Sequence, residues 1–114
     1  MSELLTIEVT QDEDIVQLHF EGNMDTNSSP DAQEALTKAI DEGARKILVN
    51  LESLDFISSA GLRVLLSAAK AIGRQGGAIR ICSLNETVSE VFEISGFDSI
   101  FNVFESRDEA VAGF

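Results

Sequence analysis

The sequence predicts a small α/β sandwich, with a mixed sheet of four to five strands and about four helices. The first segment alternates apolar and polar residues with the period of two that is typical of an antiparallel strand pair. After it, apolar runs of strand length alternate with segments of helical spacing, an order that gives parallel strands joined by right-handed crossovers. The 114 residues suit one domain spanning residues 1–114.

The first strand pair is predicted from its alternating side chains. An acidic turn at residues 11–14 separates two stretches in which every second residue is apolar. These apolar positions are Leu5, Ile7 and Val9 before the turn, and Val16, Leu18 and Phe20 after it. Because the alternation directs Leu18 and Phe20 into the core, it directs His19, the single histidine, to the outer face.

Two long helices are predicted from their first residues and their apolar spacing. Ser29-Pro30-Asp31 supplies an N-cap, a proline at the first helical position and an acidic first turn, and Gly43 is the residue type that commonly ends a helix. The first helix therefore runs to about Gly43. A second begins after Ser58-Ser59 and runs to about Arg74, because its leucines and alanines recur every three or four residues.

Two shorter helices are predicted later in the chain. Asn85 can cap a third helix that ends before Gly96. Ser106 is followed three residues later by Glu109, which is the spacing of a capping box. A short C-terminal helix is therefore predicted after Ser106.

Three further strands lie between these helices. The run Lys46–Leu51 is almost unbroken in apolar residues, which predicts a central strand covered on both faces. Ala78–Cys82 and Ile100–Phe104 are predicted as two more strands. The inward-facing residues should form one core, composed of Leu5, Ile7, Val16, Leu18, Phe20, Ile47, Val49, Leu62, Leu65, Leu66, Ile79, Ile81 and Phe92.

The composition argues against several partners and compartments. With 8 lysines and arginines against 20 aspartates and glutamates, the formal net charge is −12, so neither nucleic acid nor anionic lipid is expected as a partner. No apolar run approaches the roughly 18 residues of a membrane span, and the first residues lack a secretory signal. A cytoplasmic location without membrane insertion is expected. The single cysteine, Cys82, suits a reducing compartment and excludes a cysteine-rich metal site.

The residues offer little for catalysis. His19 is directed outward, and the consecutive acids of residues 12–14 cannot easily converge on one ion. The glycines of residues 73–77 neither follow a strand nor precede the Lys-Ser/Thr of a phosphate-binding loop. The sequence therefore predicts no enzymatic activity, no cofactor and no metal.

The most informative segment is the entry to the second long helix, where Ser58 and Ser59 precede Ala60 and Gly61. One interpretation is structural: Ser58 or Ser59 accepts a hydrogen bond from the first amides of the helix. The other is functional: Ala60 and Gly61 leave an open backbone that another protein can approach, and a phosphorylated serine suits the start of a helix. The residues alone leave both interpretations open.

Two segments carry a resemblance to a known family. Residues 54–65 read Leu-Asp-Phe-Ile-Ser-Ser-Ala-Gly-Leu-Arg-Val-Leu, and residues 21–25 read Glu-Gly-Asn-Met-Asp. The first resembles the STAS-family segment that reads aromatic or Met, then Asp/Ser-Ser-Ala/Ser-Gly-Leu, and the second is similar to that family's Gly-x-Leu-Asp turn. The resemblance covers nearly the whole chain, and within the family it is most specific to the bacterial anti-sigma factor antagonists. It implies a single STAS-like sandwich.

The resemblance implies a switch protein that is not an enzyme. In such antagonists the serine two residues before the glycine is phosphorylated by a partner that is both anti-sigma factor and serine kinase, and a metal-dependent serine phosphatase reverses this. That serine is Ser59 here. Many members carry Asp where this chain has Ser58, which makes Ser58 an alternative phosphoacceptor. The unphosphorylated protein would bind the kinase and so release a sigma factor to regulate transcription.

The alternative function is an accessory STAS module of a transporter or signalling assembly that is not phosphorylated. The free-standing length and the intact pair of serines favour the switch. The resemblance also implies a partner-binding surface built from two loops at one end of the sheet. Its expected residues are Met24, Asp25, Thr26 and Asn27, together with Ser58, Ser59, Gly61, Leu62 and Arg63.

Overall fold

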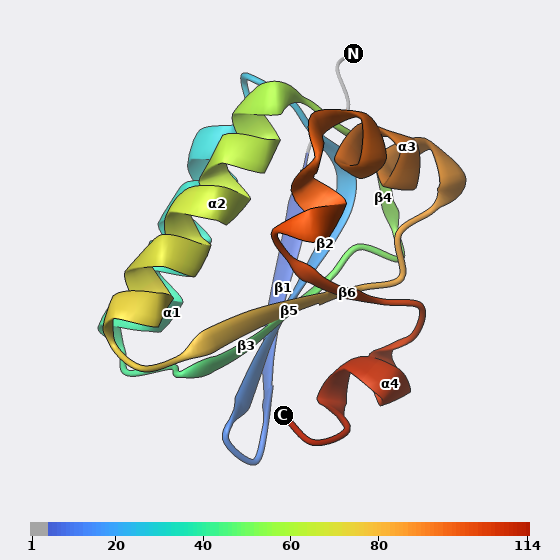
Figure 1. The fold of residues 1–114 in the computed structure, drawn as a ribbon. Helices are drawn as coiled ribbons and strands as arrows, with labels where there is room; N and C mark the ends of the chain where they lie inside the picture. Colours follow the sequence, from blue (N-terminus) through green and yellow to red (C-terminus); the bar gives the residue numbers. More distant parts are fainter. Residues whose placement is uncertain (1–4) are drawn as a thin grey trace.

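The sheet is mixed and has six strands. In the computed structural model, which describes residues 5–114, the strands are β1 Thr6–Asp12, β2 Ile15–Met24, β3 Lys46–Asn50, β4 Leu54–Ile57, β5 Ala78–Cys82 and β6 Asn102–Phe104. Their order is β1-β2-β3-β5-β6, and β4 pairs with the far end of β2, beyond β3. β1 is antiparallel to β2, and the other pairs are parallel (Figure 1). The predicted mixed α/β fold is confirmed.

Helices cover both faces of this sheet. They are α1 Ser29–Asp41, α2 Ser59–Arg74, α3 Glu86–Ser95 and α4 Arg107–Val111, with a 3₁₀ turn η1 at Phe97–Ser99. α1 and α2 pack against each other on one side of the sheet, and α4 packs on β3, β5 and β6 from the other side (Figure 1). α3 packs on β4 and η1. Over residues 5–114, every helix falls short of the length and apolar character that crossing a bilayer requires.

The prediction of four to five strands missed β4. This strand has four residues, and its two end residues, Leu54 and Ile57, are buried while the two between them are exposed. It therefore lacks the alternation that identified β1 and β2. β4 pairs with β2 only after a register shift at Gly22/Asn23, so its formation depends on a distant segment.

Two boundaries also differ from the prediction. Ser28, one residue before the predicted cap, is the N-cap of α1, and the helix ends at Asp41, with the backbone turning through Gly43 at a φ of +104°. The last strand, β6, is shorter than the predicted Ile100–Phe104, because the chain first forms η1. The predicted caps Asn85 and Ser106 are confirmed, since each accepts a hydrogen bond from the first turn of its helix.

The predicted core is confirmed as one cluster. All thirteen residues named above belong to it: nine are buried, and Leu5, Ile7, Val16 and Leu66 are partly buried against them. The central strand β3 is buried on both faces, as its apolar run predicts. Ile47 and Val49 join the main core, whereas Leu48 faces the opposite side.

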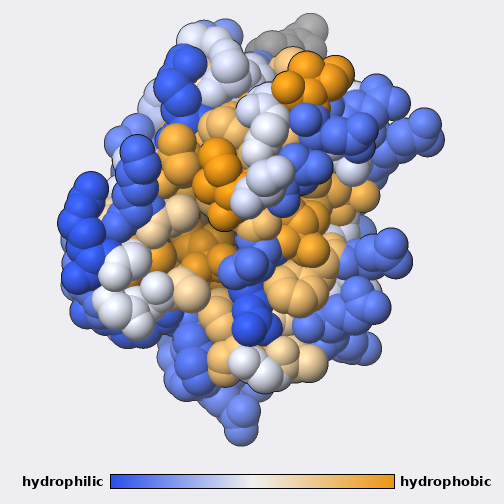
Figure 2. Space-filling view, in the orientation of Figure 1, coloured by the Kyte–Doolittle hydropathy of each residue, from blue (hydrophilic) through white to orange (hydrophobic). Residues whose placement is uncertain are grey.

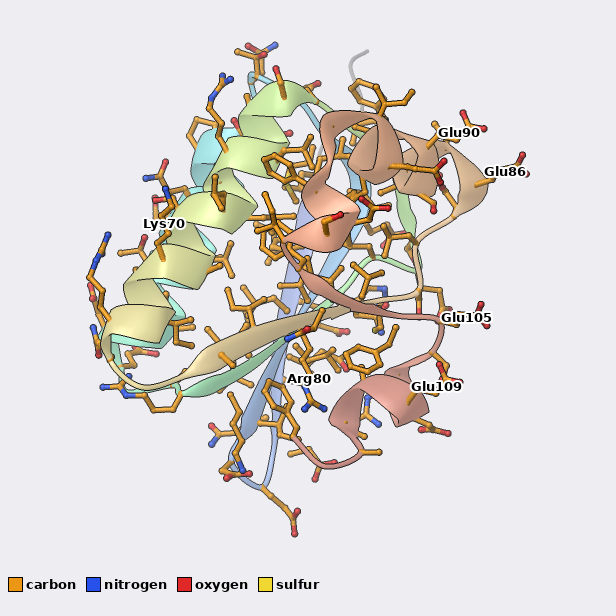
Figure 3. All side chains as sticks on the ribbon, in the orientation of Figure 1. Lys70, Arg80, Glu86, Glu90, Glu105 and Glu109 are labelled. Atoms are coloured by element: carbon orange, nitrogen blue, oxygen red, sulfur yellow. The ribbon has the colours of Figure 1, made fainter. Side chains whose placement is uncertain are left out.

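A second, smaller cluster lies beneath α4. It joins Leu48, Cys82 and Ala110, all fully buried. Arg80 of β5 holds the end of the chain over this cluster, donating to the carbonyl oxygens of Ala110 and Ala112, each at 2.9 Å. Its guanidinium also stacks on the rings of Phe104 and Phe114. Figure 3 shows Arg80 in this position, between the sheet and α4.

The outer face of β2 is more covered than its alternation predicts. His19 lies on the side opposite the main core, but it is only partly exposed, and its Nε2 atom is buried without a hydrogen-bond partner. The reason is that α4 also covers this face: its Arg107 donates to the side chain of Gln17, two residues before His19, at 2.8 Å. The predicted outward direction of His19 is therefore confirmed, and its partial burial is an addition that the alternation did not predict.

Apolar residues also reach the surface. Figure 2 shows them gathered in the middle of one face, between α2 and the C-terminal segments, with hydrophilic residues around the rim. Ile100 and Val103 are among the exposed large hydrophobic residues, at 56% and 38% of their accessible surface. The acidic side chains are mostly peripheral, as Glu86, Glu90, Glu105 and Glu109 show in Figure 3.

Candidate functional site

The two loops singled out in the sequence lie against each other. β2 and β4 run parallel, with Met24 paired to Ile57, so both strands end at the same edge. The backbone N–H of Ser58 donates to the carbonyl oxygen of Met24 at 2.8 Å, which joins the two loops directly. The site therefore consists of the loop from β2 to α1 and the entry to α2, at one end of the molecule (Figure 1). The second loop follows β4, not the central strand.

Ser58 is the N-cap of α2. Its backbone is extended, with φ −93° and ψ 173°, and its hydroxyl accepts a hydrogen bond from the N–H of Gly61 at 3.3 Å. Its carbonyl oxygen accepts from the N–H of Leu62 at 3.0 Å. The structural interpretation of the serine pair is thus confirmed for Ser58, whose hydroxyl is half-buried and already engaged.

Ser59 differs from Ser58 in its exposure and in its hydrogen bonding. It is the first residue of α2 and is exposed. Its hydroxyl makes no hydrogen bond to any residue of the part of the chain that the structure describes. A second protein can reach the free hydroxyl of Ser59 directly. The hydroxyl of Ser58 would first have to lose its hydrogen bond from the Gly61 N–H.

Met24, Gly61 and Leu62 lie in the core, not on the surface expected for them. Met24 is 0% and Leu62 4% exposed. A Cβ atom added to Gly61 would lie 2.8 Å from Cγ1 of Ile57 and 3.0 Å from the Met24 side chain. Gly61 is therefore required by close packing inside the protein, and the predicted open backbone for a partner at this residue is wrong.

Asp25 shapes the loop that precedes α1. Its Oδ1 atom accepts hydrogen bonds from the backbone N–H groups of Asn27 and Ser28, each at 2.9 Å. The Ser28 hydroxyl accepts from the Asp25 N–H at 2.9 Å and donates to the carbonyl oxygen of Asn23 at 2.7 Å. This second role of Ser28 depends on contacts with Asn23 and Asp25 that no sequence motif indicates. Thr26 and Asn27 are left exposed at the tip of the loop.

The hydrogen bonds that Asp25 accepts also stabilise its ionised form. The hydrogen bond from the Ser28 N–H holds the pKa of the Asp25 carboxyl below its ordinary value of 3.8. A lowered pKa means that the ionised carboxylate supports the folded loop above about pH 4, and that this support is lost as the pH falls through the lowered pKa.

We expect Asp25→Asn to keep the loop and to remove its acid sensitivity. The amide oxygen can accept the same two backbone hydrogen bonds, but it does not titrate. The backbone amide NMR signals of Asn27 and Ser28, followed from about pH 6 to about pH 2, should shift with a single acid step in the wild type. The same step in the Asp25→Asn variant would contradict this assignment.

Arg63 stands one turn after Ser59 on α2 and is exposed. Within residues 5–114, its guanidinium forms no ion pair and no hydrogen bond. Phe56 of β4, at 41% exposure, adds an apolar side chain two residues before Ser58. Phe56 belongs to the resembling segment of residues 54–65, but it is not among the partner-binding residues that the resemblance implies.

The two loops present groups that a second protein could recognise. In the part of the chain that the structure describes, no three His, Cys, Asp or Glu side chains gather as a metal site would require. The one carboxylate of the two loops, Asp25, is occupied by backbone amides. A hollow of about 830 Å³ lies elsewhere, between the β1–β2 hairpin and α1. The site offers a free hydroxyl, a free cation and an exposed loop tip.

Replacing Ser58 and replacing Ser59 should have different effects on the free energy of unfolding. Ser58→Ala removes the cap of α2 and should lower the free energy of unfolding by about 0.5–2 kcal/mol. Ser59→Ala removes no hydrogen bond among the described residues and should change it by less than about 0.5 kcal/mol. Urea unfolding of both variants checks this, and equal losses would contradict the division of roles.

The chain matches known proteins along most of its length. The STAS domain description matches residues 6–110. A Bordetella bronchiseptica protein named as an anti-sigma factor antagonist, BtrV, is 43% identical over 95 residues, which cover 83% of this chain and 82% of that protein.

Solved structures share the fold at lower identity. An anti-sigma factor antagonist of Thermotoga maritima has a TM-score of 0.88 and 22% identity, covering 93% of this chain and 92% of that one. The anti-sigma factor antagonist SpoIIAA in its unphosphorylated form has a TM-score of 0.80 and 22% identity, covering 93% of each chain. SpoIIAA in its phosphorylated form has a TM-score of 0.73 and 21% identity, covering 94% of this chain and 97% of that one. With its six-stranded mixed sheet, its serine-capped entry to α2 and a family match over residues 6–110, the chain belongs to the STAS domain family.

Proposed function

We propose that this chain is an anti-sigma factor antagonist that is switched by phosphorylation of Ser59. The observation that carries the proposal is the exposed Ser59 hydroxyl, unbonded among the described residues, at the first position of α2. Two comparisons support it: the 43% identity with BtrV, and the fold shared with SpoIIAA, which has been solved with and without phosphorylation.

In its unphosphorylated form the protein binds an anti-sigma factor and so frees a sigma factor to act in transcription. The binding surface consists of the exposed residues Thr26, Asn27, Ser59 and Arg63, with Asp25 holding the first loop in shape. Met24, Gly61 and Leu62 support this surface from beneath. The proposal places the protein in the cytoplasm.

The partner is also the kinase, and this chain supplies only the phosphoacceptor. The Ser59 oxygen attacks the γ-phosphorus of ATP, a new O–P bond forms, ADP leaves, and the hydroxyl proton passes to a base of the kinase. A metal-dependent serine phosphatase restores the hydroxyl by hydrolysis. No residue of this chain acts as a catalyst.

Phosphorylation ends binding by adding charge to a surface that has to be dehydrated. The phosphoryl group carries about −1.5 to −2 charges at neutral pH, and covering it without a matching cation on the partner costs several kcal/mol. A partner surface that fits the neutral Ser59 hydroxyl of the unphosphorylated protein is therefore not matched to this charge.

Phosphorylation by the cognate kinase tests the proposal. Incubation with kinase and ATP should raise the mass of the wild type by about 80 Da, and peptide fragmentation should place the phosphate on Ser59. Ser58→Ala should still be phosphorylated, whereas Ser59→Ala should not. Phosphate on Ser58 alone would move the site by one residue. A doubly substituted Ser58→Ala/Ser59→Ala protein that is still phosphorylated, with unchanged partner binding, would refute the switch.

A pull-down from host lysate identifies the partner class. Wild type and Ser59→Ala should retain a serine kinase that Ser59→Asp does not retain. A membrane transporter held equally by all three proteins would instead support an accessory STAS module, and would contradict the proposal.

A further inference from the structure

Ser59 and Arg63 lie four residues apart within the continuous helix α2. Residues with this spacing are neighbours on the helix surface, with Cβ atoms about 5–6 Å apart. Both side chains are exposed, and the flanking residues Leu62 and Val64 are buried, so Ser59 and Arg63 share the outward face. Lys70 lies seven residues beyond Arg63, two turns along the same face, and Figure 3 shows it on the outer surface of α2.

Arg63 has no other partner in the part of the chain that the structure describes. Among the described residues, Arg45, Arg80 and Arg107 each donate to an oxygen atom of the protein, whereas Arg63 and Arg74, near the two ends of α2, do not. The first turn of α2 has no acidic residue that could neutralise it. A fixed helix thus presents an unused guanidinium beside the hydroxyl that the proposed function phosphorylates.

We infer that Arg63 binds the phosphoryl group of phosphorylated Ser59 within the same chain. This inference rests on the proposed function for the modification, and it adds the residue that receives the phosphate. The order of the pair is the favourable one on a helix, with the anion four residues before the cation. A guanidinium also matches a phosphoryl group geometrically, because two parallel N–H groups can donate to two of its oxygen atoms.

The pairing changes what phosphorylation does to the surface. In the unphosphorylated protein Arg63 is free to contact a partner, and in the phosphorylated protein it is turned back to its own helix. The modification therefore alters two groups of the binding surface at once. It also lowers the cost of placing a phosphate on a chain whose net charge is already −12.

The second ionisation of the phosphate measures this contact. A phosphoserine has its second pKa near 6, and a cation bound to the dianion lowers it. Protein with phosphoserine incorporated at position 59 during synthesis needs no kinase, so this test is independent of whether Ser59 is the kinase's target. We expect Arg63→Gln to raise the ³¹P NMR titration midpoint by about 0.3 pH units, as an exposed pair of this spacing would.

Lys70→Gln is the matched control. It removes the same charge from the same face of α2, about 16 Å along the helix from Ser59 and beyond the screening length at physiological salt. Its titration midpoint should equal that of the wild type. In a second measurement, the Nε–H signal of Arg63 should shift on phosphorylation and follow the same midpoint. Equal midpoints for Arg63→Gln and Lys70→Gln, with an unmoved Arg63 signal, would overturn the inference.

Discussion

Replacing Leu65 with alanine should lower the free energy of unfolding by about 2–5 kcal/mol. Leu65 is 0% exposed and belongs to the main core, where α2 packs on the sheet. Truncation removes buried methyl groups and leaves a cavity that the neighbouring side chains fill only in part. Denaturant unfolding followed by circular dichroism measures the loss.

Ile94→Ala is the control for this prediction. Ile94 is 87% exposed on α3, so its truncation should change the free energy of unfolding by no more than about 0.5 kcal/mol. Similar losses in the two variants would mean that α2 does not pack as described. The Leu65→Ala protein that remains folded should still accept phosphate on Ser59, because Leu65 faces away from the site.

Ser59→Asp should weaken binding to the anti-sigma partner by about a hundredfold or more. The carboxylate places a negative charge inside the proposed contact surface, and burying a charge that the partner does not neutralise costs at least the roughly 2.7 kcal/mol that this factor represents. Most of the change should appear as faster dissociation in surface plasmon resonance, as is usual for substitutions within an interface. The melting temperature should stay near that of the wild type, since Ser59 is exposed.

Ser67→Asp tests whether position matters more than charge. Ser67 is exposed on the same helix, two turns after Ser59 and outside the proposed surface. It adds the same charge to the same element and should leave the affinity within about twofold of the wild type. Equal weakening by both substitutions would show that general repulsion, not the site, controls binding.

The fold could be predicted because its signals are local. The alternation of β1 and β2, the caps Asn85 and Ser106, and the apolar run of β3 each depend on neighbouring residues in the sequence. β4 could not be predicted in this way, since its four residues become a strand only by pairing with the end of β2. The same holds for His19, whose outer face is covered by a helix that lies almost ninety residues away in the sequence.

The candidate site shows the same difference between local sequence signals and contacts that depend on the fold. The sequence marked both loops and both serines, but it could not tell which serine caps α2, because either hydroxyl suits that position. It also placed Met24, Gly61 and Leu62 on the surface, although Gly61 is a glycine because Ile57 and Met24 pack against it. Such contacts across the fold are not encoded in the spacing of a motif.

The small cluster beneath α4 contains a cysteine whose reactivity reports on local unfolding of the C-terminal segment. Cys82, its single thiol, is 0% exposed between Leu48 and Ala110, and burial raises its pKa. Because the thiolate is the reactive form, an alkylating reagent at neutral pH can act only when α4 and the residues clamped by Arg80 lift away from the sheet. The rate at which Cys82 is alkylated therefore measures how often the C-terminal segment opens locally. The measurement needs no engineered cysteine and does not depend on phosphorylation of Ser59.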